Sequence, residues 1–100
     1  MNMKKDFEKK IQIKIEECQS CIEKLKEKSS ASPAELRQQC CNFIDDLSLK
    51  QEAARKKLEE IRKASEEDWK NMYPVATKLY DALAETVEKA LDWGASKFNL

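Results

Sequence analysis

The chain has 100 residues, of which 38% are charged, and its 19 lysines and arginines balance its 19 acidic residues. This composition excludes a disordered tail, and the even charge balance excludes the clustered positive charge that a nucleic-acid-binding surface needs. Because Glu, Lys, Ala, Leu and Gln dominate and there is one glycine, we expect a single all-α domain with no nucleic-acid partner.

The N-terminus reads MNMKKDFEKK and becomes charged at once, so a secretory signal with an apolar central region is not expected. No apolar run approaches the ~18 residues that a membrane-spanning helix requires. The sequence therefore predicts a cytoplasmic protein with reduced thiols, and it makes a membrane partner unlikely.

A first helix is predicted over residues 4–28. Its apolar residues are spaced by four, three, four and three, as in the seam of a coiled coil: Ile11, Ile15, Cys18, Ile22 and Leu25. A turn is predicted at 29–32, where Ser32 is expected to cap the next helix, with Pro33 in its first position and Glu35 completing a capping box.

A second helix is predicted over residues 33–72, because Leu36, Cys40, Phe43 and Leu47 repeat the same spacing. Two such helices joined by a short turn predict an antiparallel hairpin. If the turn is centred near residue 31, Ile15 faces Leu47.

The third segment, predicted as a helix over residues 74–97, has apolar residues eleven apart, such as Trp69, Tyr80 and Leu91. Pro74 disfavours an unbroken helix, whereas Ser65 followed by acidic residues is typical of a helix start. Three alternatives remain open: one long kinked helix, a turn near residues 71–74 that folds the last helix back as a third bundle member, and a break at Ser65.

Residues 64–98 carry a pattern of an Ala-Ser-Glu start, spaced apolar residues and a closing Ser-Lys-Phe. The matching positions are Ala64, Ser65, Glu66, Asp68, Trp69, Met72, Val75, Ala82, Leu83, Ala95, Ser96, Lys97 and Phe98. In these residues the chain resembles a group of small, uncharacterised bacterial coiled-coil proteins. The resemblance implies a helical, oligomeric protein and supplies no catalytic residues. Pro74 and the four cysteines depart from that pattern.

Four cysteines flank the predicted turn, at Cys18, Cys21, Cys40 and Cys41. Three interpretations are open: thiols that pack in the helix seam, a disulfide from Cys21 to Cys40 or Cys41, and a thiol-based metal-binding or redox site formed by all four. A tetrahedral zinc site needs four sulfurs around one point, and the Cys40–Cys41 pair lacks the spacing of a metal knuckle. Packing thiols are therefore the favoured interpretation.

No histidine is present to activate a nucleophile, and no glycine-rich phosphate loop occurs. We therefore expect a protein that is not an enzyme and that holds no cofactor.

The aromatic C-terminal segment is the other candidate site, because Trp and Tyr are favoured anchors at protein interfaces. The sequence predicts a scaffold or interaction protein that forms a dimer or trimer, or docks a protein partner, through one apolar stripe. That stripe consists of Trp69, Met72, Leu79, Tyr80, Leu83, Val87 and Leu91. A helix lying on a membrane surface is the alternative, and the acidic polar face of this segment disfavours it.

Overall fold

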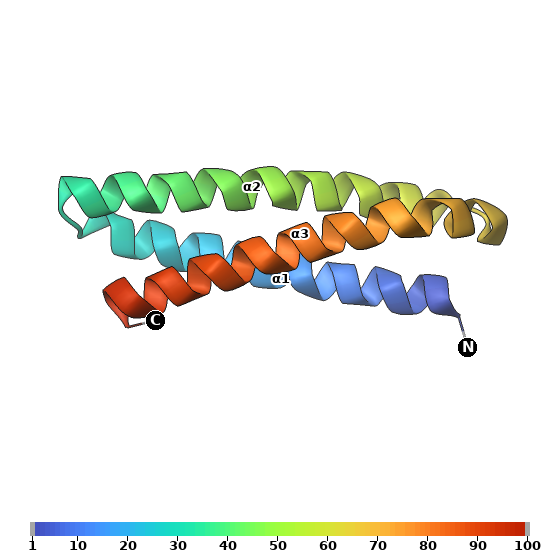
Figure 1. Ribbon diagram of the computed structural model, residues 1–100, viewed down its shortest axis with the longest axis horizontal. Helices are drawn as coiled ribbons and strands as arrows, with labels where there is room; N and C mark the ends of the chain where they lie inside the picture. The colour runs from blue at the N-terminus through green and yellow to red at the C-terminus, as the bar shows by residue number, and fades with distance from the viewer. Residues whose placement is uncertain (1, 100) are drawn as a thin grey trace.

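The computed structural model describes residues 2–99, which form three helices and no strand: α1 (Met3–Ser30), α2 (Ala34–Lys63) and α3 (Glu66–Phe98). Figure 1 shows α1 and α3 running in the same direction, with α2 antiparallel to both. The bundle measures 51 × 21 × 17 Å, and its radius of gyration of 15.5 Å exceeds the ~13 Å of a compact domain of this length. The prediction of an all-α helical hairpin and bundle is confirmed, and the molecule is a short rod.

The second reversal of the chain falls at Ala64 and Ser65. The predicted helix over 33–72 therefore ends early, at Lys63, and the predicted helix over 74–97 is part of the longer α3, which continues through Pro74. Ser65 caps α3, since its hydroxyl accepts a hydrogen bond from the Asp68 N–H at 3.1 Å, and three acidic residues occupy the positive first turn. Pro74 lies on the exposed side of α3, where the carbonyl it leaves unpaired can turn toward water.

The first turn differs in detail from the capping box predicted there. Pro33, in an extended conformation, is the N-cap of α2 and makes no side-chain cap. The Ser32 hydroxyl instead donates to the Lys28 carbonyl at 2.6 Å, so it closes the end of α1. The φ of −60° at Pro33 fits a helix, but its ψ of 159° does not, so the helix starts one residue later than predicted.

Helices α1 and α2 pair about one helical turn away from the predicted register. The buried Gln51 side chain donates to the Ile15 carbonyl at 3.3 Å and to the Gln19 side chain at 3.0 Å. Gln51, rather than Leu47, thus lies at the level of Ile15. Because an unpaired buried amide is costly, this pair of bonds favours the observed register over neighbouring ones.

The core runs along the rod between the three helices, and α3 fills the groove of the α1–α2 hairpin. Residues seven apart in α3 are fully buried: Ala76, Leu83 and Ala90 are each 0% exposed. The predicted eleven-residue series of Trp69, Tyr80 and Leu91 drifts out of the core, from 4% exposure at Trp69 to 39% at Leu91. A heptad repeat therefore describes α3 better, as the left-handed packing of a helix bundle requires.

Candidate functional site

The four cysteines do not converge on one point. Cys18, Cys21 and Cys40 are buried, Cys41 is exposed, and all four are free thiols. Residues 2–99 contain no group of three or more His, Cys, Asp or Glu side chains placed to hold a metal ion. Of the three open interpretations, neither the disulfide from Cys21 to Cys40 or Cys41 nor the four-cysteine site is formed among the described residues. Cys41 lies on the surface, apart from the helix seam that buries the other three.

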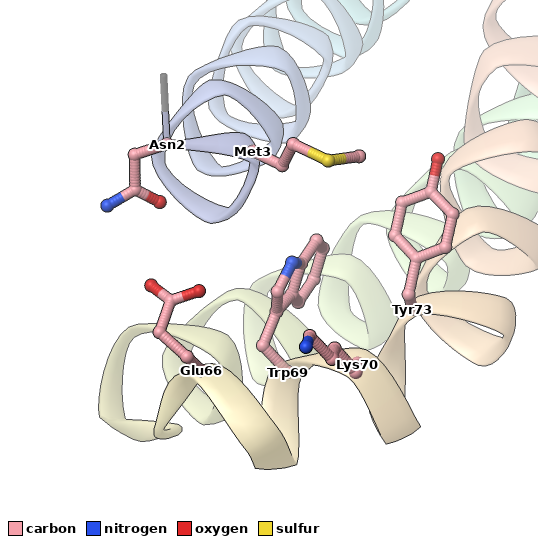
Figure 2. Close-up of a pocket in the computed structure, with 6 residues that line it drawn as sticks. All are labelled: Asn2, Met3, Glu66, Trp69, Lys70 and Tyr73. Atoms are coloured by element: carbon pink, nitrogen blue, oxygen red, sulfur yellow. The ribbon is translucent and has the colours of Figure 1, made fainter.

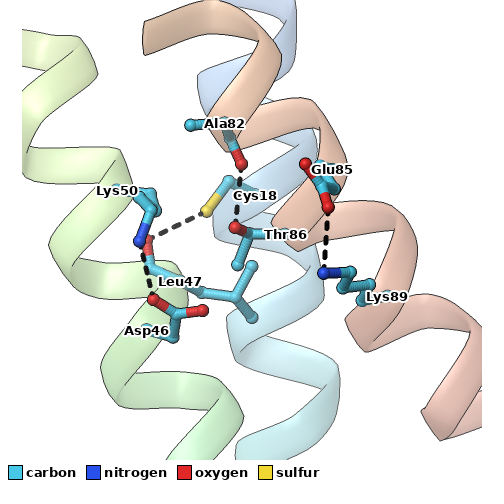
Figure 3. A network of polar contacts seen from close by, with 8 residues as sticks. All are labelled: Cys18, Asp46, Leu47, Lys50, Ala82, Glu85, Thr86 and Lys89. Carbon is cyan, nitrogen blue, oxygen red and sulfur yellow. Dashed lines mark hydrogen bonds and ion pairs between the residues drawn. The ribbon is translucent and has the colours of Figure 1, made fainter.

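The buried thiols act as small apolar side chains. Burial raises the pKa of the Cys18 thiol to about 11, and it also raises the pKa of Cys21 and Cys40. Figure 3 shows the Cys18 thiol directed from α1 at the Leu47 carbonyl of α2, 3.5 Å away. Thiols held in the protonated form are poor nucleophiles and poor metal ligands, so this chemistry favours a packing role.

The stripe predicted as a contact surface lies mostly inside the bundle. Leu83, Val87 and Trp69 are 0%, 2% and 4% exposed. Met72, Leu79 and Tyr80 are half-buried, and Leu91 is exposed. Most of the stripe is therefore covered by α1 and α2 of the same chain.

An aromatic cluster joins the starts of α1 and α3 at one end of the bundle. The Phe7 ring of α1 lies 5.2 Å from the Trp69 ring, 5.9 Å from Tyr73 and 6.2 Å from Tyr80. The Lys10 ammonium sits 4.4 Å from the centre of the Tyr80 ring, within the range of a cation–π contact. Because the two helices are parallel, the first turns of both are brought to this end.

Two helix caps hold these first turns in place. The Asn2 side chain accepts a hydrogen bond from the Lys5 N–H at 3.2 Å and caps α1, as Ser65 caps α3. Such caps each stabilise a helix start by about 1 kcal/mol. The caps thus set where α1 begins, at Met3, and where α3 begins, at Glu66.

Two open hollows lie over this cluster. The larger, of about 540 Å³, is shown in Figure 2, where Trp69 rises from α3 toward Met3, with Glu66 and Tyr73 on either side. The smaller, of about 240 Å³, is bordered by Asp6 and Lys10 of α1. Met3 and Tyr73 line both hollows. We call the combined surface the end groove; it consists of Asn2, Met3, Asp6, Phe7, Lys10, Glu66, Trp69, Lys70 and Tyr73.

The end groove has an apolar floor and a charged rim. Phe7 and Trp69 are buried beneath it, while Met3 and Tyr73 are 65% and 42% exposed. Aromatic floors with a few polar groups around them are typical of binding sites. The rim carries two carboxylates and two ammonium groups, so its charges balance. The arrangement suits recognition of an apolar group.

Of the end-groove residues, the predicted contact stripe included only Trp69. Met3, Phe7 and Tyr73 were missed as members of one surface, because Tyr73 on α3 is 66 or more positions away along the chain from Met3 and Phe7 on α1. The Ala-Ser-Glu-Glu-Asp helix start at Ser65 was the signal that could have found them. A reversal at that point places the start of α3 beside the start of α1.

No protein-family model, curated protein or solved structure matches this chain. Within residues 2–99, none of the three helices has an apolar stretch long enough to cross a lipid bilayer.

Proposed function

We propose that this chain is a non-enzymatic interaction or scaffold protein that binds another protein chain through the end groove. The observation that carries the proposal is the pair of exposed apolar side chains, Met3 and Tyr73, that stand over a floor of buried aromatic rings. Exposed apolar side chains gathered over a hollow and rimmed by charge are typical of contact surfaces.

The rest of the surface supports this choice by contrast. Leu49 of α2 is 68% exposed and borders neither hollow of the end groove. Ile13 of α1, which is 55% exposed, borders a hollow whose lining contains no aromatic ring. The ion pairs of the described residues join side chains three or four positions apart on one helix, which is the pattern of a solvated helix surface. The resemblance of residues 64–98 to small bacterial coiled-coil proteins implies an oligomeric protein, which agrees with a surface that binds another chain.

Site-specific photo-crosslinking tests the proposal. Tyr73→p-benzoyl-phenylalanine places a photoreactive ring in the end groove, and the same replacement at Leu49 is the matched control on α2. After irradiation of cells that express either variant, the crosslinked peptides are identified by sequencing. We expect a defined adduct from position 73 that is lost when Met3→Glu is added, and background labelling from position 49. Equal labelling from both positions, or none from position 73, would contradict the proposal.

A further inference from the structure

We infer that the partner seated in the end groove is a second copy of this chain, related to the first by a two-fold axis that passes beside Met3 and Tyr73. The inference rests on the proposed function and names its partner. A two-fold contact requires one surface that is complementary to itself. The shape and the charge of the end groove each meet that requirement.

The shape supplies a projecting side chain and a hollow within one surface. Met3 is 65% exposed and borders both hollows, so it projects from the rim that the hollows share. The hollow of about 540 Å³ is large enough for an unbranched thioether side chain, and methionine adapts readily to irregular gaps and to aromatic rings. Met3 of each copy can therefore enter the Trp69-floored hollow of the other copy.

The charges are arranged in the same reciprocal way. The larger hollow is bordered by Glu66 and Lys70, and the smaller by Asp6 and Lys10, so each hollow holds one carboxylate and one ammonium group. A two-fold axis between the hollows sets the larger hollow of one copy against the smaller hollow of the other. Glu66 then faces Lys10 of the other copy, Lys70 faces Asp6, and each pair occurs twice.

The same balance of charge disfavours a membrane surface or nucleic acid as the occupant. A rim with two positive and two negative groups offers no net attraction to an anionic membrane surface or to nucleic acid phosphates. A second copy, in contrast, presents the opposite sign at each position of the rim. Electrostatic complementarity of this kind selects the partner and fixes the relative orientation more than it adds affinity.

The contact is expected to be weak, because the end groove covers only the first turns of two helices. An interface of this size falls at the low end of specific contacts, and we expect a dissociation constant on the order of 0.1 mM. Lys10 already lies over its own Tyr80 ring at 4.4 Å, so in the dimer its ammonium would be shared between that ring and the Glu66 carboxylate of the other copy.

Sedimentation equilibrium of the full chain, from about 10 μM to about 0.5 mM, tests the inference. We expect a reversible monomer–dimer equilibrium, weakened at least about tenfold by Met3→Glu. Leu49→Glu, which places the same charge at a side chain of similar exposure on α2, should leave the equilibrium unchanged. A monomer throughout this range, or equal effects of the two variants, would overturn the inference.

Charge exchange tests the two-fold geometry. Lys10→Glu and Glu66→Lys should each weaken self-association about tenfold, because each brings like charges together twice. An equimolar mixture of the two variants restores both attractive pairs, so it should form a heterodimer about as tight as the wild-type dimer. Circular dichroism confirms that each variant is folded. A mixture that stays monomeric refutes the arrangement. If the purified chain is monomeric while position 73 crosslinks to a different protein in cells, the proposed function stands and the second copy is excluded as partner.

Discussion

At the scale of single residues, the cysteines show how burial decides between several chemical interpretations of one motif. Cys18 lies in the predicted seam with Ile15 and Ile22, and all three are at most 4% exposed. Heptad spacing made that position predictable, since a cysteine behaves as a small apolar side chain. The exposure of Cys41 was harder to predict from the sequence. Neighbouring side chains on a helix point about 100° apart, so the helix register decides whether Cys40 or Cys41 faces the core.

The burial of the thiols predicts their reactivity. At about pH 8, iodoacetamide should label Cys41 rapidly in the folded protein, because only thiolates react and burial both shields the other three and raises the pKa of Cys18 to about 11. Intact-mass spectrometry should show one added group in the native state and four after denaturation. Cys41→Ser is the control and should remove the rapid phase. Two or more rapid additions to the native protein would contradict the packing described here.

At the scale of elements, α3 contains two signals that conflict. Ser65 and the acidic residues after it begin a helix, and Pro74 would break one. The structure satisfies both, because Pro74 lies on the exposed side, where no packed neighbour is displaced. A local rule therefore indicated where α3 starts, whereas the tolerance of Pro74 depended on which side of the helix faces the core.

Replacement of Pro74 should stabilise the protein. Pro74→Ala restores the helical hydrogen bond to the Lys70 carbonyl, and we expect the free energy of unfolding to rise by about 2 kcal/mol, since part of the gain is offset by a more flexible unfolded chain. Urea unfolding followed by circular dichroism measures the change. Pro33→Ala is the matched control at the N-cap of α2, where no helical bond is restored, and it should change stability by less than about 1 kcal/mol. A Pro74→Ala variant no more stable than wild type would show that the helix already accommodates the proline without cost.

At the scale of the whole molecule, the hairpin of α1 and α2 needs a third helix to cover its open apolar side. Helix α3 of the same chain is that helix. A hairpin of two long helices leaves one apolar side uncovered, and a third helix can come from the same chain or from a copy. Because α3 folds back onto the α1–α2 hairpin, the three helices form a rod with one continuous core. It also leaves Met3 and Tyr73 exposed over the buried aromatic rings of the end groove.

Two leucines of α3 test this arrangement directly. Leu83 is 0% exposed and Leu91 is 39% exposed, so Leu83→Ala should lower the free energy of unfolding by about 2–5 kcal/mol through the cavity it leaves. Leu91→Ala, the same chemical change on the same helix, should cost less than about 1 kcal/mol. Urea unfolding at one low protein concentration compares them. Equal costs for the two variants would mean that α3 does not pack on α1 and α2 as described.

What the sequence determined by itself is local: three helical segments, and the inward side of α1, whose five predicted seam residues are all buried. These are Ile11, Ile15, Cys18, Ile22 and Leu25. Periodicity and composition act within a few turns, so they can be read without knowing the fold. Only the tertiary structure decided that α3 folds back on its own hairpin and that Met3 and Tyr73 share one surface. An apolar stripe must be covered, but its sequence pattern is the same whether its own chain or another copy covers it. The turn at Ala64 and Ser65 decides between these two, because it folds α3 back onto its own hairpin.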